Sequence, residues 1–182
     1  MHMAEHQLQG DGFLLRAWRT SDLDALLRHA NDEQVARGVS DRFPSPYTRE
    51  DGQQFLAGKV LDFRDPMYAI EIDGEACGGI SAHAGQGERS QSAEFGYWLG
   101  RAYWGKGTMT GAVALFAPWV MRELQLYRLY ATVLGFNIGS AQVLRRNGFM
   151  EEGVQRAAVF KRGVLHDLRL FAKVRRNLDH DF

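Results

Sequence analysis

Residues 94–120 read EFGYWLGRAYWGKGTMTGAVALFAPWV. They predict a strand over 93–99, a tight turn through Gly105 and Gly107, and a helix that begins near Thr108. The two glycines let the backbone approach a ligand with no Cβ in the way. The helix leaves its first N–H groups unpaired at the positive end of its dipole. Such an arrangement binds phosphate or pyrophosphate, so the turn predicts a site for a phosphorylated cofactor.

The usual phosphate-loop patterns do not fit this turn. A Walker A loop needs Gly-x-x-x-x-Gly-Lys-Ser/Thr, and the spacing from Gly100 to Thr108 does not give it. The dinucleotide pattern Gly-x-Gly-x-x-Gly also fails, because Thr110 stands where the third glycine belongs. As a bare pattern, a Gly-x-Gly turn is more often an ordinary strand-to-helix connection. The identity of the cofactor therefore depends on the wider context.

The bulk composition predicts one globular domain over residues 1–182, with 1–10 as a flexible N-terminus. The 22 basic and 22 acidic residues balance, which argues against direct, nonspecific binding of nucleic acid. No apolar run approaches the ~20 residues of a membrane span, and the polar N-terminus has no signal-peptide pattern. The single cysteine, Cys77, fits a reducing compartment. We therefore expect a cytoplasmic protein without a membrane partner, as a monomer or homodimer.

Hydrophobic periodicity and turn signals predict a mixed order of helices and strands. After a strand over 13–19, Ser21 is expected to cap a first helix, and Thr48 a second helix over about 49–63. The pattern leaves the α/β and α+β classes both open. Further strands are predicted at 67–72, 75–83, 93–99, 128–134, 150–160 and 164–174, and further helices at 108–122 and 138–147.

Two segments carry a family resemblance. Residues 96–112 resemble the acetyl-coenzyme A loop of the GNAT N-acetyltransferases, closest to the ribosomal-protein (RimJ/RimL-like) branch. Residues 137–149, NIGSAQVLRRNGF, are similar to the second motif of that branch, and the two motifs stand in the expected order. Residues 13–16 and 166–168 look like the family's opening and last strands. Residues 37–63 carry little family signal, and there substrate specificity is expected to vary.

The resemblance implies an α+β fold and an acetyl-CoA-dependent transfer to a primary amine. The sheet would be mixed and mostly antiparallel, with about six to seven strands, helices on both faces and a splay where the cofactor inserts. The acceptor would be a protein N-terminal α-amino group or a small-molecule amine. The residues that the resemblance assigns to acetyl-CoA are Leu99, Trp104, Gly105, Lys106, Gly107, Thr108, Asn137 and Ser140.

Acetyl transfer to an amine needs a base for the amine and a proton for the leaving thiolate. Glu94, in an apolar run where we expect burial, is the candidate base. A structural glutamate that bonds to a neighbouring loop is the alternative. Ser140 is the candidate acid, and a first-turn helix serine that satisfies backbone donors is the alternative. Phe43 and Tyr47 flank the loop between the first two helices, and both are expected to line the acceptor pocket. The scattered histidines give no metal-ligand spacing, so we expect no metal.

Two departures from the family pattern concern the chemistry. The tyrosine that often protonates the thiolate in the wider family is replaced here by Leu144. The second carboxylate of the ribosomal-protein branch falls at Val159, which has no acid–base function. The alternative to an enzyme is therefore a non-catalytic acyl-CoA-binding sensor or interaction module of the same fold.

Overall fold

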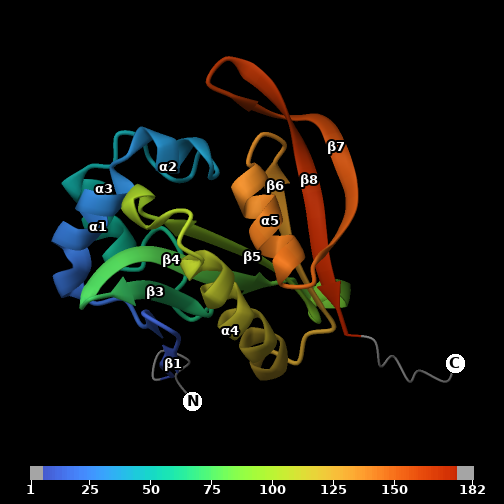
Figure 1. Ribbon diagram of the computed structural model, residues 1–182, viewed down its shortest axis with the longest axis horizontal. Coiled ribbons are helices and arrows are strands. Elements are labelled where there is room, and N and C mark those ends of the chain that lie inside the picture. Colours follow the sequence, from blue (N-terminus) through green and yellow to red (C-terminus); the bar gives the residue numbers. More distant parts are fainter. Residues whose placement is uncertain (1–5, 176–182) are drawn as a thin grey trace, which may run out of the picture.

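The computed structural model describes residues 6–175 and builds them around one eight-stranded sheet in the order β1-β2-β3-β4-β5-β6-β8-β7 (Figure 1). Neighbouring strands are antiparallel except for β5 and β6, which are parallel. The strands are β1 (Leu8–Gln9), β2 (Leu14–Arg16), β3 (Met67–Ile72), β4 (Glu75–Ala84), β5 (Ser92–Leu99), β6 (Arg128–Leu134), β7 (Met150–Lys161) and β8 (Val164–Val174).

Helices cover both faces of the sheet, as expected. On β5, Phe95 and Leu99 point into the main hydrophobic core with α4 and α5, whereas Trp98 points into a second cluster on the opposite face. That second cluster packs α1 and α3 against the sheet. The helices are α1 (Leu23–Ala30), α2 (Glu33–Arg37), α3 (Arg49–Leu56), α4 (Thr108–Glu123) and α5 (Ile138–Arg146). No helix within residues 6–175 is long and apolar enough to cross a membrane.

The parallel pairing of β5 with β6 is short. Only Ser92 to Glu94 pair with Arg128 to Tyr130, after which β6 continues beside β8 alone. The two strands therefore diverge beyond Glu94, and α5 lies beside the opening (Figure 1). This splay is the feature that the family resemblance predicts for the α+β fold.

Several details differ from the sequence-based expectations, including the first predicted strand, which spans only Leu14–Arg16. The sheet has eight strands rather than about six to seven, because β1 is a two-residue strand too short to show a period, and it falls within the expected flexible N-terminus. Helix α2 is an additional element, capped by Asp32. Helix α3 ends at Leu56 rather than near 63, and Gly58 follows with φ 69°, a left-handed conformation that a helix cannot include. Residues 1–5 lie outside the described residues.

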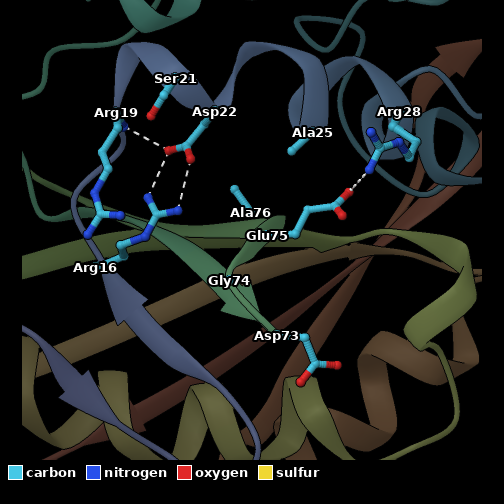
Figure 2. Close-up of a pocket in the computed structure, with 10 residues that line it drawn as sticks. All are labelled: Arg16, Arg19, Ser21, Asp22, Ala25, Arg28, Asp73, Gly74, Glu75 and Ala76. Atoms are coloured by element: carbon cyan, nitrogen blue, oxygen red, sulfur yellow. Dashed lines mark hydrogen bonds and ion pairs between the residues drawn. The ribbon is translucent and has the colours of Figure 1, made fainter.

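The expected cap by Ser21 is wrong, and a buried ion pair holds this turn instead. Asp22 accepts a bond from the backbone N–H of Arg19 at 2.8 Å. The same carboxylate pairs with both terminal nitrogens of Arg16 at 2.8 Å (Figure 2). Arg16 is 1% exposed and also bonds to Glu71 of β3. The pair therefore anchors the start of α1 to the first strands of the sheet. Thr48, by contrast, caps α3 in a capping box with Asp51, as predicted.

Substitution of Asp22 should destabilise the fold, because it leaves a buried guanidinium short of its bidentate partner. We expect Asp22→Asn to lower the free energy of unfolding by about 3 kcal/mol, measured by urea denaturation. Asp24→Asn is the control, since the Asp24–Arg49 pair is exposed and such pairs contribute about 0–1 kcal/mol. Equal effects of the two substitutions would contradict a structural role for the buried pair.

Candidate active site

The turn before α4 presents backbone N–H groups to solvent. Gly105 and Gly107 have φ values of 74° and 84°, and Gly107 is the N-cap of α4. No side chain bonds to that helix start. A Cβ at either glycine would meet nothing within 4 Å, so the space outside the turn is open. The uncapped start of α4 can therefore hold an anion through its backbone, as the sequence predicts.

Trp104 fixes the turn in place. Its indole N–H donates to the carbonyl of Leu99 at 2.7 Å, which ties the turn to the end of β5. The ammonium of Lys106 lies 5.5 Å from the ring centre of Tyr103 and remains exposed. The predicted cofactor residues from Leu99 to Thr108 thus form one continuous segment around the helix start. The Leu99 carbonyl is bonded to Trp104, and the assignment of Leu99 to the cofactor stays a prediction.

Asn137 joins two parts of the chain at the start of α5. Its side-chain oxygen accepts from the N–H of Ser140 at 3.1 Å, which confirms the N-cap role. Its side-chain nitrogen donates to the carbonyl of Gly38 at 3.3 Å. A Cβ on Gly38 would lie 3.1 Å from that nitrogen, so glycine permits the close approach. Asn137 therefore fixes both the helix and the loop after α2.

The Ser140 hydroxyl meets Tyr97 rather than a backbone group. The two oxygens lie 2.8 Å apart, and the Tyr97 oxygen also lies 3.2 Å from the Ser140 carbonyl oxygen, so the single phenol proton can go to either acceptor. Burial raises the pKa of Tyr97 to about 12, so the phenol keeps its proton at neutral pH. Tyr97 lies on β5 beyond the last residue that pairs with β6. The pair therefore stands at the opening between the two strands.

The expected burial of Glu94 is wrong. Its side chain is exposed, and its carboxylate accepts a bond from the Thr132 hydroxyl at 3.3 Å. Glu94 is the last β5 residue paired with β6, so it marks the fork of the splay. Alternation along the strand puts it on the face opposite to Tyr97. The two candidate catalytic groups thus approach the splay from opposite faces of the sheet.

Aromatic side chains form a wall on the Glu94 face. Phe43 lies 5.3 Å from Trp98 and 5.2 Å from Tyr47, measured between ring centres. Phe43 is partly exposed, whereas Tyr47 is 6% exposed, and burial raises the pKa of Tyr47 to about 12. Phe43 can therefore contact an acceptor, and the buried ring of Tyr47 packs against Phe43 from the protein interior.

The two positions that depart from the family pattern are structural here. Leu144 is fully buried in the main core, and Val159 on β7 pairs with His166 on β8.

Sequence reasoning missed Tyr97, because its partner is 43 positions away. It also missed the Lys161 tie to Val39 and Asp41, over an even longer separation. For Tyr97, the only local signal was a tyrosine on the apolar face of the motif strand. Within residues 6–175, no group of three His, Cys, Asp or Glu side chains is placed to hold a metal.

The sequence profile described as the acetyltransferase (GNAT) domain matches residues 13–150. The chain is 43% identical over 82 residues to the "Probable N-acetyltransferase YjcK" of Bacillus subtilis, covering 45% of each chain. It is 35% identical over 118 residues to the "Putative ribosomal N-acetyltransferase YdaF" of the same organism, covering 65% of this chain and 64% of the relative. The matches thus span less than two thirds of the length of these two relatives.

A solved structure extends the likeness over nearly the whole chain. Mycobacterium smegmatis RimJ in complex with CoA-disulfide superposes with a TM-score of 0.81 at 25% sequence identity. The superposition covers 96% of this chain and 88% of that one.

Proposed function

The chain belongs to the GNAT acetyltransferase family, and from this premise we propose that it moves the acetyl group of acetyl-CoA to a primary amine. The observation that carries the proposal is the splay between β5 and β6, with the Ser140–Tyr97 pair on one face and Glu94 on the other. An opening of this kind lets two substrates meet from opposite faces of one sheet. We propose a single domain over 1–182 that acts in the cytoplasm.

The cofactor would bind along α4, β5 and α5. The uncapped N–H groups at Gly107 and Thr108 suit the pyrophosphate, and exposed Lys106 adds a positive charge. The β5 backbone beyond Glu94 has no β6 partner, so its polar groups are available to the amides of the pantetheine arm. Asn137 and Ser140 at the start of α5 would then lie beside the thioester. These contacts fit an extended phosphorylated thioester.

Ser140 is the group that we assign to the leaving sulfur. The amine nitrogen attacks the thioester carbonyl carbon, the C–S bond breaks, and the thiolate must gain a proton or a hydrogen bond. If Tyr97 donates to the serine oxygen, the serine proton is free to face the sulfur. A phenol that stays protonated at neutral pH keeps this order of donation available. Tyr97 is thus a positioning residue that acts through Ser140.

Glu94 is the group that we assign to the amine. Its exposed carboxylate at the fork can accept a proton from the incoming ammonium, directly or through water, and Thr132 orients it. The acceptor would enter past Phe43, from the face that carries the aromatic wall. A protein N-terminus and a small-molecule amine both fit this description. One relative is named for ribosomal acetylation, which supports the former.

A non-catalytic acyl-CoA sensor is the second candidate. The observation that favours it is Val159, which stands in a β7–β8 pair with no acid–base group where the ribosomal-protein branch has a carboxylate. Incubation with acetyl-CoA and a panel of N-terminal peptides and small amines separates the two candidates. Amine-dependent release of free coenzyme A thiol supports the enzyme, and tight binding without release supports the sensor.

The cofactor turn makes a prediction about coenzyme A binding. Gly107→Val should weaken the affinity for coenzyme A at least about tenfold, because a branched side chain crowds the pyrophosphate at the helix start. Calorimetry measures the change. Gly74→Val is the control, since Gly74 has a similar φ of 82° and similarly open surroundings but lies in the β3–β4 turn. If both variants bind coenzyme A equally well, the pyrophosphate lies elsewhere.

The Ser140–Tyr97 pair makes a prediction about turnover. Ser140→Ala should lower kcat roughly 10²-fold and leave the affinity for acetyl-CoA nearly intact, as expected on losing a hydrogen bond to developing charge. Tyr97→Phe should lower kcat less, and should have no further effect in the Ser140→Ala background. Steady-state rates of the two single variants and the double variant test this cycle. Independent, additive losses would mean that Tyr97 does not act through Ser140.

The position of Glu94 at the fork makes a third prediction. Glu94→Gln should lower kcat by roughly 10²-fold, within the usual range for an acid–base group. Glu88→Gln, on the exposed turn η3 (Gly87–Arg89), is the matched control and should retain full activity. A Glu94→Gln protein with a normal rate would return this carboxylate to a structural role.

A further inference from the structure

A small basic pocket lies where the β7–β8 hairpin meets the end of α2. Its volume is about 180 Å³, below the ~300 Å³ at which pockets for whole small molecules begin. It therefore suits one group of a larger ligand. Every charged residue that lines it is basic or a histidine, and the lining consists of Arg37, Phe136, Lys161, Arg162, Val164 and His166.

Lys161 brings a buried hydrogen-bond donor to this pocket. It is 5% exposed, and its ammonium donates to the Val39 carbonyl at 2.8 Å and to the Asp41 carboxylate at 2.6 Å. An ammonium has three N–H donors. The third has no partner among residues 6–175. This donor can therefore bind an acceptor atom in the pocket, and a hydrogen bond from a charged donor is stronger than one from a neutral donor.

Arg37 adds a positive charge that no residue within 6–175 pairs with. Its guanidinium lies 4.9 Å from the ring centre of Phe136, and it has no ion pair or hydrogen bond to any described residue. Arg162, by contrast, pairs with Glu33 at 2.6 Å, and Lys161 pairs with Asp41. The pocket thus keeps a positive charge after its neighbouring acids are counted. It also keeps free donors on a planar group that suits a carboxylate.

The pocket shares backbone with the transfer site. Phe136 directly precedes Asn137, and Arg37 directly precedes Gly38. Asn137 links the two segments, since it donates to the Gly38 carbonyl at 3.3 Å and accepts from the Ser140 N–H at 3.1 Å. A group held by Arg37 and Lys161 would therefore sit beside the residues that position Ser140.

We propose that this pocket binds a carboxylate of the acceptor, so that preferred acceptors carry a negative charge near the primary amine. The proposal rests on the proposed function, and it narrows its substrate class. Phe136 and Val164 would contact the short aliphatic stem of the acid, while Arg37 and Lys161 bind its oxygens. An acidic side chain near a protein N-terminus and the α-carboxylate of a free amino acid share this chemistry.

Matched acceptors test the proposal. Short amidated peptides that begin with serine and carry one Glu at the second, third or fourth position are compared with the same peptides carrying Gln. Serine and serinamide form the small-molecule arm. The wild-type protein should prefer at least one acid over its amide by about tenfold in kcat/KM, the order of a charge-assisted hydrogen bond. The arm that shows the preference identifies the source of the carboxylate.

Substitution then assigns the preference to the pocket. Arg37→Gln should reduce the ratio of kcat/KM for the acid to kcat/KM for its amide to near one, mainly through the KM of the acceptor. It should leave the KM of acetyl-CoA unchanged. Arg89→Gln is the control, since Arg89 is exposed on η3 and has no described ion pair. The proposal is overturned if the wild-type protein shows no preference for any acid, or if Arg37→Gln keeps it.

A direct binding measurement separates this proposal from the proposed function. Calorimetry titrates the Glu and Gln peptides into the protein saturated with coenzyme A, where no turnover occurs. Stronger binding of a Glu peptide that is lost in Arg37→Gln supports the pocket, even if no acceptor is ever acetylated. Equal binding of the paired peptides overturns the pocket, even if the chain proves to be an active acetyltransferase.

Discussion

The loss of pairing between β5 and β6 beyond Glu94 is the constraint on which the rest of the site depends. A parallel pair that ends after three residues leaves one edge of β5 without a strand, and backbone polar groups on such an edge need other partners. The start of α5 partly fills the opening, and Tyr97 reaches across it to Ser140. The same opening connects the two faces of the sheet. Candidate groups for cofactor and acceptor can therefore act on one bond from opposite faces.

Asn137 and Lys161 fix the loop after α2 beside this opening. Asn137 ties the start of α5 to Gly38, and Lys161 ties the end of β7 to Val39 and Asp41. The loop after α2 is thus held from two elements that come much later in the chain. Both ties depend on side chains that are at least partly buried, so they are costly to break. Arg37, directly before this loop, and Lys161 both line the basic pocket, so the pocket and the start of α5 are held by the same contacts.

Local patterns predicted much of the fold. The strands at 67–72 and 128–134 have the predicted bounds, and the turn at Gly105 and Gly107 precedes a helix at Thr108 as expected, because period, glycine and cap signals act over a few residues. The exposure of Glu94 could not be predicted, since whether a strand face is covered depends on distant elements. The Tyr97–Ser140 pair and the Lys161 tie were missed for the same reason: each joins side chains far apart in sequence.

Amide hydrogen exchange with and without acetyl-CoA tests most directly that the cofactor occupies the splay. On the unpaired edge of β5, the N–H group of Tyr97 points away from β4, since successive strand N–H groups alternate in direction. This group and the N–H groups in the first turn of α4 should become protected when acetyl-CoA binds, because they gain partners. The β3–β4 turn at Asp73 and Gly74 should exchange at the same rate in both states. Tight binding of acetyl-CoA with no added protection at Tyr97 would contradict the splayed site.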